Sequence, residues 1–485
     1  MVDQRMVDKY IKKLKYIVAE SISRKKYRKA MAALSSCARI LYNYNQYYTD
    51  EDLEEYVIEL SRLVKIKNGY TANEKTILFY DGFGFDLRGL AVTYIRALVE
   101  NHYTVVYITN EKVRHRIPHI INEMKGNPIH FIRMENYLNW VEDINKIFSI
   151  YKPLTAFFYT NPNDVAAAVV FRAYEGLVNR IQIDLTDHAF WLGVKSIDFM
   201  VTGRMLGASI GVFERGIGRE KIIRLDCAPY IDRSICEEQL PFDIKAQKYF
   251  FSGGSLYKTL GDPDLLYYKI VNDVLAYDKE IIFLYAGSGD ASQMNVLKAL
   301  YPGRVYLINE RTDFFSLIEN AEFFLNTYPM FGGLMMRFSA IAGKLPLTLK
   351  HEDDSAGILE NQSDLGIEFD SYEELIDEIK KSLSDLEYRH RKELALQTSV
   401  MSEKEFRENL KKLVEHHITD YSFGELVPID TSRFRKEYLE RFDYFQDIVK
   451  EIALIRNGDL VFNFPKEFLV KTRSVLRRKI FNGKF

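Results

Sequence analysis

The first 70 residues place apolar side chains at the period of an α-helix. Ile11, Leu14, Val18 and Ile22 follow one another at spacings of three or four residues, which puts them on one face of a helix. The same spacing recurs in two further sets, Met31, Leu34, Ala38 and Leu41, and Leu53, Tyr56, Leu60 and Leu63. Asp50 stands before the third set, where it is expected to cap the helix. The pattern predicts a helical N-terminal extension over residues 1–70.

From residue 71 the pattern changes to short, β-branched apolar runs with helical stretches between most of them. The runs expected to be strands are 76–81, 104–110, 129–134, 155–160, 179–185, 198–203 and 221–230. Alternation of strand and helix at these lengths is typical of a parallel, doubly wound sheet. Residues 71–235 are therefore predicted to form one Rossmann-like domain.

The alternation restarts after a polar stretch around Pro241. The five further runs that we expect to be strands are 248–254, 280–287, 304–310, 321–329 and 345–350. They predict a second, smaller doubly wound domain over residues 243–370. Beyond it the apolar positions return to helical spacing, and residues 371–485 are predicted to be helical. The expected fold class is α/β, with two Rossmann-like domains and helical extensions at both ends.

Composition and charge exclude several classes of function. A chain of 485 residues is too long for one hydrophobic core. Its net charge of −2 creates no global field for nucleic acid, so no nucleic-acid partner is expected. The three cysteines lack metal-ligand spacing, and no apolar signal core or 18-residue apolar run occurs. A cytoplasmic location is expected.

The second domain opens with residues suited to phosphate binding. Its first predicted strand ends in Gly253 and Gly254, Ser255 comes next, and Lys258 follows three positions later. Glycines let backbone N–H groups approach a ligand closely, and ligands of open α/β sheets bind at the carboxyl ends of the strands. These residues are candidates to bind the diphosphate of a nucleotide sugar. The alternative is an ordinary strand-to-helix loop with a solvated lysine.

Two successive sheets followed by a helical tail resemble the GT-B glycosyltransferases. The stretch GGSLYKTLGDPD (253–264) is similar to the donor-site segment of GT-B enzymes of the O-GlcNAc-transferase type, in which a lysine contacts the UDP diphosphate. Lys258 falls at that position. The block 320–349 resembles a second donor segment of that family, and Asn326, Gly332 and Gly333 are in step with it. The resemblance implies a UDP-sugar substrate, no separate cofactor, and a donor site formed by these residues.

The second block departs from the family at the position of a carboxylate that binds the ribose hydroxyls. Hydrophobic residues and Arg337 follow the two glycines, and no acid stands there. Asp353, Asp354 and Glu360 are alternative sources of a ribose contact. The departure also permits a protein that binds a partner and has no activity of its own.

Two loops of the first domain are candidates for the acceptor side. Gly84, Asp86 and Arg88 follow the first strand and are candidate contacts for the acceptor or a phosphate. Asp86 and Arg88 equally suit a helix cap and a salt bridge. Asp187 and His188 follow the fifth strand. Because imidazole titrates near neutrality and can exchange a proton with a hydroxyl group, His188 is the candidate catalytic residue and Asp187 its orienting neighbour. The alternatives are a purely structural histidine and an aspartate that simply caps the following turn.

The acidic strings 262–264 and 352–354 resemble the metal-binding DxD of another glycosyltransferase fold. The first of them precedes a predicted helix, where capping is the expected role, so no essential metal is expected. The tail 466–485 carries seven Lys or Arg against one Glu. Two interpretations stay open for it: peripheral contact with the inner face of an anionic membrane, or packing against the first domain.

The function expected from these features is metal-independent transfer of a hexose from a UDP-sugar. The acceptor would be a surface polysaccharide, a lipid-linked glycan or a protein. Two alternatives remain: a non-catalytic GT-B-like partner or chaperone subunit of a glycosyltransferase, and a UDP-sugar epimerase.

Overall fold

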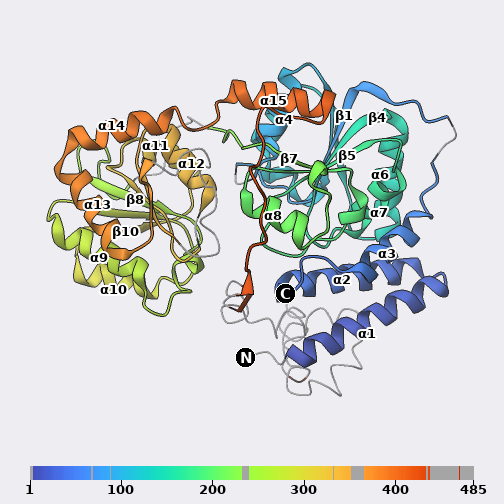
Figure 1. Ribbon diagram of the computed structural model, residues 1–485, viewed down its shortest axis with the longest axis horizontal. Coiled ribbons are helices and arrows are strands. Elements are labelled where there is room, and N and C mark those ends of the chain that lie inside the picture. Colours follow the sequence, from blue (N-terminus) through green and yellow to red (C-terminus); the bar gives the residue numbers. More distant parts are fainter. Residues whose placement is uncertain are drawn as a thin grey trace, which may run out of the picture.

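Two α/β domains lie side by side, and helices at the N-terminus and near the C-terminus add to the larger one (Figure 1). The structure is a computed structural model that describes residues 4–66, 69–87, 89–231, 240–330, 332–350, 365–432, 435–436 and 469. The basic tail 466–485, apart from Leu469, and the acidic string 352–354 lie outside the described residues.

The first domain is built on a seven-stranded parallel sheet. In chain order its strands are β1 (Asn73–Asp81), β2 (Thr104–Asn110), β3 (Ile129–Ile132), β4 (Pro153–Tyr159), β5 (Asn179–Ile183), β6 (Phe199–Thr202) and β7 (Ile222–Arg224). Their order across the sheet is β3-β2-β1-β4-β5-β6-β7. The chain reverses direction across the sheet between β1 and β4, which is the doubly wound topology.

Both faces of this sheet are covered by helices. Leu78 and Tyr80 of β1 enter one hydrophobic core, and Ile77 and Phe79 enter another on the opposite face, because side chains alternate along a strand. The covering and connecting helices are α4 (Ala91–Glu100), α5 (Pro118–Glu123), α6 (Tyr137–Tyr151), α7 (Val165–Ala173) and α8 (Met205–Phe213). The strands are consequently almost continuous apolar runs, as parallel sheets require.

Three helices precede the sheet: α1 (Gln4–Ser23), α2 (Tyr27–Tyr44) and α3 (Glu51–Ser61). The expected cap of the third helix is confirmed, since the Asp50 side chain accepts a hydrogen bond from the N–H of Leu53. Their apolar faces share one core with α6, α7 and one face of the first sheet. The N-terminal helices therefore form a layer of the first domain rather than a separate extension.

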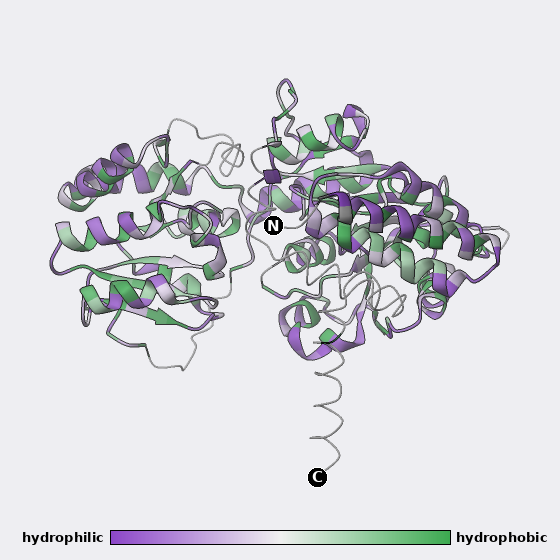
Figure 2. Ribbon diagram, turned by 90° about the horizontal axis from the view of Figure 1, so that it is seen from below, coloured by the Kyte–Doolittle hydropathy of each residue, from purple (hydrophilic) through white to green (hydrophobic). Residues whose placement is uncertain are grey.

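The second domain contains a six-stranded parallel sheet. Its strands are β8 (Tyr249–Gly253), β9 (Ile282–Ala286), β10 (Val305–Ile308), β11 (Phe324–Leu325), β12 (Pro346–Leu349) and β13 (Glu368–Phe369), in the order β10-β9-β8-β11-β12-β13. Its helices are α9 (Leu266–Tyr277), α10 (Ser292–Leu300), α11 (Phe314–Glu319) and α12 (Gly333–Ile341). Hydropathy colouring shows apolar strands inside this domain and polar residues on its outer helices (Figure 2).

The C-terminal helices are divided between the two domains. Leu375 and Leu383 of α13 (Tyr372–Ser384) and Leu396 of α14 (Leu386–Gln397) belong to the core of the second domain. Helix α15 (Glu403–His416) returns to the first domain and lies beside α4 (Figure 1). There Phe406 packs edge-on against Tyr94, with their ring centroids 5.1 Å apart.

After α15 the chain stops being helical. Residues 418–431 have no helix, so the prediction of a helical chain from 371 to 485 is wrong over this segment. The segment runs along the first domain, where the Thr419 hydroxyl donates to the carbonyl of Arg224 at 2.6 Å. Further on, the Arg435 guanidinium donates to the carbonyl of Gln46 at 3.2 Å and pairs with Glu214 at 3.0 Å. Helical periodicity could not predict these contacts. They attach residues 418–431, which we call the strap, and Arg435 to the first domain, including the segment after α2.

Candidate functional site

The first strand of the second sheet ends at a crossing of two glycine-rich loops. Gly254 has φ +129°, and its N–H donates to the carbonyl of Ala286 at the end of β9. A Cβ on Gly287 would collide with the carbonyl of Gly254. The glycines of this segment therefore serve the close approach of two loops, and Gly253 itself lies within β8. Ser255 comes after Gly254 and precedes a short 3-10 helix over Leu256–Thr259.

Lys258 lies in that 3-10 turn, at the carboxyl end of the second sheet. Its side chain is half-buried, and its backbone carbonyl accepts a hydrogen bond from the N–H of Met330 at 3.3 Å. Met330 belongs to the loop between β11 and α12, so the two predicted donor segments contact one another. A side chain of α12 also reaches β8, since Met335 Cε would lie 3.7 Å from a Cβ on Gly253.

Asn326 holds the second of these segments in place. Its buried Oδ1 accepts hydrogen bonds from the N–H groups of Thr327 at 3.0 Å and Gly332 at 2.9 Å, and its amide nitrogen donates to the hydroxyl of Thr348. The polar groups of Asn326 and the N–H of Gly332 are thus already engaged within the loop. They position the start of α12 at Gly333, which lies at the same edge as Lys258.

The loop after β1 is organised by a residue that the sequence did not single out. Asp81 Oδ1 accepts from the N–H groups of Phe83 and Gly84, both at 2.9 Å, and Oδ2 accepts from the Tyr107 hydroxyl at 2.6 Å. Burial raises the pKa of Asp81 to about 6, and these hydrogen bonds offset part of the rise. Gly84 has φ +62° and lies against Val113, so glycine serves the turn there.

Asp86 has a structural role in this loop. Its carboxylate accepts from the N–H groups of His119 and Ile120, at 3.2 Å and 3.0 Å, and lies 2.6 Å from Nδ1 of His119. It therefore fastens the loop to α5, as the helix-cap alternative expects, and its contact with an acceptor or a phosphate stays a prediction. Arg88 lies outside the described residues.

The loop after β5 gathers several charged side chains around Asp187 and His188. Asp187 Oδ2 lies 3.0 Å from Nε of Arg204, and its Oδ1 lies 3.4 Å from Nδ1 of His188. Arg215 is buried and donates from one nitrogen to the carbonyls of Thr186, Asp187 and Ala189. Asp187 and His188 are thus brought together as predicted, while their two arginine neighbours come from residues further along the chain.

A second carboxylate, Asp184, lies beneath this loop. Neither of its buried oxygens accepts a hydrogen bond from the described residues. Burial raises the pKa of Asp184 to about 7, and the charge of Arg215 offsets part of the rise. For Asp187 burial also opposes the charge, but Arg204 and His188 outweigh it and hold its pKa at about 2. At neutral pH the ionised carboxylate beside His188 is therefore Asp187.

The N-terminal helices support this loop from below. The Asn45 amide, at the end of α2, donates to the carbonyl of His188 at 3.1 Å. The buried carboxylate of Glu54 in α3 accepts from the N–H groups of Gly193 at 2.8 Å and Lys195 at 3.0 Å. On the other side, α8 approaches so closely that a Cβ on Gly207 would lie 3.1 Å from Cβ of Asp187.

Among the described residues, Arg337 forms a buried contact between the carboxyl ends of the two sheets. Arg337 of α12 lies 3.5 Å from Asp226, which follows β7, and donates to the carbonyl of Cys227 at the same distance. The start of α12 belongs to the Lys258 edge, and β7 lies two strands from β5. The Lys258 and His188 loops are therefore on the edges of the two sheets that this contact connects.

Sequence reasoning missed two groups at these edges. Asp184, Arg204 and Arg215 lie around the Asp187–His188 loop. Sequence patterns carried little signal for them, because Asp184 falls within the predicted strand 179–185. In the second domain the Ser288 hydroxyl, after β9, donates to Glu310 at 3.3 Å, after β10. Glu310 is an acid at the carboxyl edge of the second sheet, where Lys258 also lies, whereas Asp353, Asp354 and Glu360 lie outside the described residues.

The part of the chain that the structure describes contains no cluster of side chains suited to bind a metal ion. No group of three or more His, Cys, Asp or Glu side chains there is placed to hold an ion. Asp262, the first acid of the 262–264 string, accepts a hydrogen bond at 2.7 Å from the N–H of Leu266, the first residue of α9. The N-cap position itself is Leu265, which makes no side-chain capping bond. No described helix combines the length and the apolar character needed to cross a bilayer.

The sequence matches no protein-family model and no curated protein. Solved structures are similar to it in fold. A putative UDP-N-acetylglucosamine 2-epimerase from Listeria monocytogenes aligns with 71% of this chain and 97% of its own, with a TM-score of 0.53 and 10% identity. The Anabaena protein HepE in complex with UDP and glucose aligns with 70% of this chain and 99% of its own, with a TM-score of 0.52 and 12% identity.

An O-GlcNAc transferase mutant from Thermobaculum terrenum aligns over 90% of this chain and 81% of its own, at 15% identity, with a TM-score of only 0.47. That score leaves the expected kinship with the O-GlcNAc-transferase type without structural support. The alignments at higher scores, together with two parallel Rossmann-like sheets and a helix that returns to the first domain, show that the chain has the GT-B fold.

Proposed function

We propose that the protein is a glycosyltransferase that transfers a sugar from a UDP-sugar, without a metal ion, to a glycan, lipid-linked or protein acceptor. The observation that carries the proposal is the pairing of a lysine edge with a histidine edge. Lys258 lies in one loop beside the start of α12, His188 lies in another with an ionised carboxylate, and Arg337 connects the two sheet edges. In HepE, a protein of the same fold, UDP and glucose are bound.

Each edge supplies one part of the chemistry. Negative charge grows on the leaving diphosphate in the transition state, and the Lys258 ammonium would stabilise it as a point charge. On the other edge, His188 would accept the proton of the acceptor hydroxyl. Asp187 would orient the imidazole and stabilise the imidazolium that forms, because its carboxylate stays ionised at neutral pH.

A second candidate function is epimerisation of a UDP-sugar. The observation that favours it is the likeness to the Listeria protein, whose TM-score is the higher of the two reported above 0.5. Incubation with UDP-sugars distinguishes the candidates. Slow release of UDP supports transfer, a changed sugar that is still attached to UDP supports epimerisation, and neither product supports a non-catalytic partner of another glycosyltransferase.

Replacement of Lys258 by alanine tests the donor site directly. A charge-assisted contact contributes about 1.5–3 kcal/mol, so the Kd of UDP in calorimetry is expected to rise by roughly 10- to 100-fold. Lys269→Ala, at an exposed position of α9, is the matched control and is expected to leave the Kd unchanged. Equal affinities of Lys258→Ala and the wild type would remove the phosphate assignment.

A further inference from the structure

The N-terminal hairpin concentrates positive charge in a chain that is acidic elsewhere. Residues 4–30, which form α1 and the turn into α2, contain ten Lys or Arg and two acidic residues. Their net charge of +8 within a chain of net charge −2 leaves −10 for the remaining residues. Such asymmetry is typical of a surface that meets an anionic partner.

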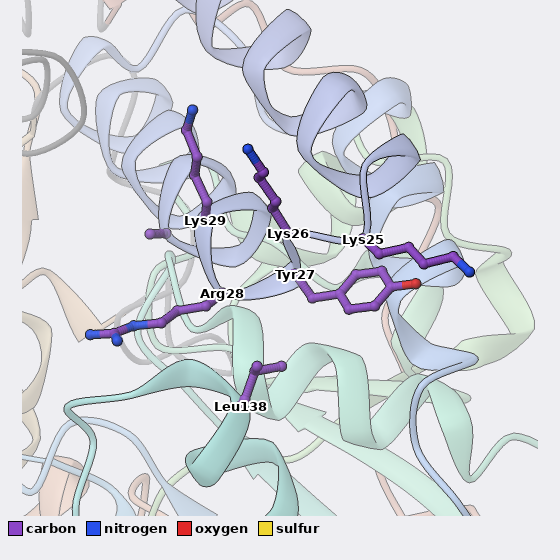
Figure 3. A pocket seen from close by; sticks show the side chains of 7 residues that line it. Lys25, Lys26, Tyr27, Arg28, Lys29 and Leu138 are labelled. Carbon is purple, nitrogen blue, oxygen red and sulfur yellow. The ribbon is translucent and has the colours of Figure 1, made fainter.

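Five of these cations cluster at the turn between α1 and α2, which we call the basic tip: Arg24, Lys25, Lys26, Arg28 and Lys29. All five are exposed. Four of them, Lys25, Lys26, Arg28 and Lys29, line a hollow of about 450 Å³ together with Tyr27, Ala32 and Leu138 of α6. Lys25 and Arg28 project to opposite sides of it, with Leu138 below (Figure 3).

Acidic neighbours do not neutralise the tip. Arg24 pairs with Glu20 at 3.2 Å, but none of the described residues forms an ion pair with the other four cations. Charges of one sign this close together repel one another. The charges of these four cations therefore contribute nothing favourable to folding, and they are available to an outside anion.

The outer face of α1 extends the tip along the molecule. Its exposed positions are Arg5, Lys9, Lys12, Tyr16, Ala19 and Ser23, at the three- and four-residue spacing of a single helical face. None of them is acidic, and the Tyr16 side chain is 65% exposed. A helix of 20 residues is about 30 Å long, so the face is a straight stripe with three cations in its N-terminal half and the basic tip at its other end.

The geometry points to an anionic membrane surface as the partner of this stripe and tip. A straight stripe can contact a plane along its whole length, and clustered Lys and Arg bind anionic headgroups electrostatically. Tyrosine is enriched at the headgroup level of membranes, where the exposed ring of Tyr16 would lie. The apolar face of α1 is buried in the core of the first domain, so α1 would lie on the headgroups without inserting.

Vesicle flotation of the full-length protein tests this assignment. We expect the wild type to float with vesicles of phosphatidylglycerol and phosphatidylcholine in about a 1:2 ratio, but not with phosphatidylcholine alone. Each cation near an anionic surface contributes about fivefold in affinity, so the combined variant K25Q/K26Q/R28Q/K29Q should bind at least about 100-fold more weakly. K9Q/K12Q should weaken binding further when added to it.

The matched control removes four exposed lysines elsewhere, K125Q/K245Q/K279Q/K411Q, so that the net charge changes equally. It should retain vesicle binding, and all variants should keep the wild-type melting temperature because the residues are exposed. Equal losses in the tip variant and the control, or a tip variant that floats like the wild type, would overturn the assignment. Tip-dependent binding to duplex RNA without flotation would overturn it in favour of nucleic acid. None of these readouts depends on UDP binding.

Discussion

Replacing Asp164 by asparagine should change how the stability of the first domain depends on pH. Asp164 precedes α7 and is 4% exposed, and Oδ2 accepts a hydrogen bond from the Tyr80 hydroxyl at 2.7 Å. Burial raises its pKa from 3.8 to about 7, with the hydrogen bond offsetting part of the rise. The folded state therefore holds this proton more tightly than the unfolded state.

The sign and size of the effect follow from proton linkage. With a raised folded pKa, the contribution of Asp164 to stability is complete below about pH 4 and is lost as the pH rises to about 7. Each pH unit in that window changes the free energy of unfolding by about 1.4 kcal/mol. Asparagine keeps the acceptor for Tyr80 and has no proton to lose. The stability of Asp164→Asn relative to the wild type should therefore rise by about 3 kcal/mol between pH 5 and pH 8.

Urea unfolding followed by tryptophan fluorescence measures this difference. Both tryptophans of the chain, Trp140 and Trp191, belong to the core of the first domain, so the signal reports the domain that contains Asp164. Asp264→Asn, an exposed aspartate of the second domain, is the matched control and should show the same pH dependence as the wild type. A relative change below about 1 kcal/mol for Asp164→Asn would refute the argument that burial sets this pKa.

Two further predictions concern the interdomain edges. His188→Ala should lower the rate of sugar transfer about 100-fold or more while UDP affinity in calorimetry stays the same, and a near wild-type rate would leave the histidine with a structural role only. Arg337→Ala should loosen the contact with Asp226 and increase the radius of gyration in X-ray scattering. Breaking a buried ion pair typically costs about 3–5 kcal/mol of folding stability. The loss of stability in Arg337→Ala should be smaller, because Arg224 still lies 3.6 Å from Asp226. An unchanged scattering profile would show that the domains are held together elsewhere.

Local patterning predicted the elements of this protein well. All twelve predicted strands are present, and the two sheets are divided where the polar stretch around Pro241 interrupts the alternation. Strands buried on both faces read as apolar runs, and such runs are visible in a single sequence. The prediction missed the two-residue strand β13, whose residues are only partly buried and do not belong to an apolar run.

The sequence also located the loops of the candidate site, since ligand-binding loops of α/β sheets follow the carboxyl ends of strands. It did not determine what each side chain does there. Asp86 holds α5, Asn326 holds its own loop, and Arg215 reaches the Asp187 loop from beyond α8. These hydrogen bonds join residues that are far apart in the sequence and come together only when the chain folds.

The sequence by itself determined where the strands lie along the chain and the two-domain α/β class. It also placed Lys258 and His188 in loops that follow strands. Only the tertiary structure decided which helices join which core. In the folded protein α1–α3 pack on the first sheet, α15 packs beside α4, and residues 418–431 form a strap without helix along the first domain. The physical reason is that strand and helix periods arise from neighbouring residues. Packing of a helix on one domain or the other depends on apolar surface contributed by residues far away in the chain.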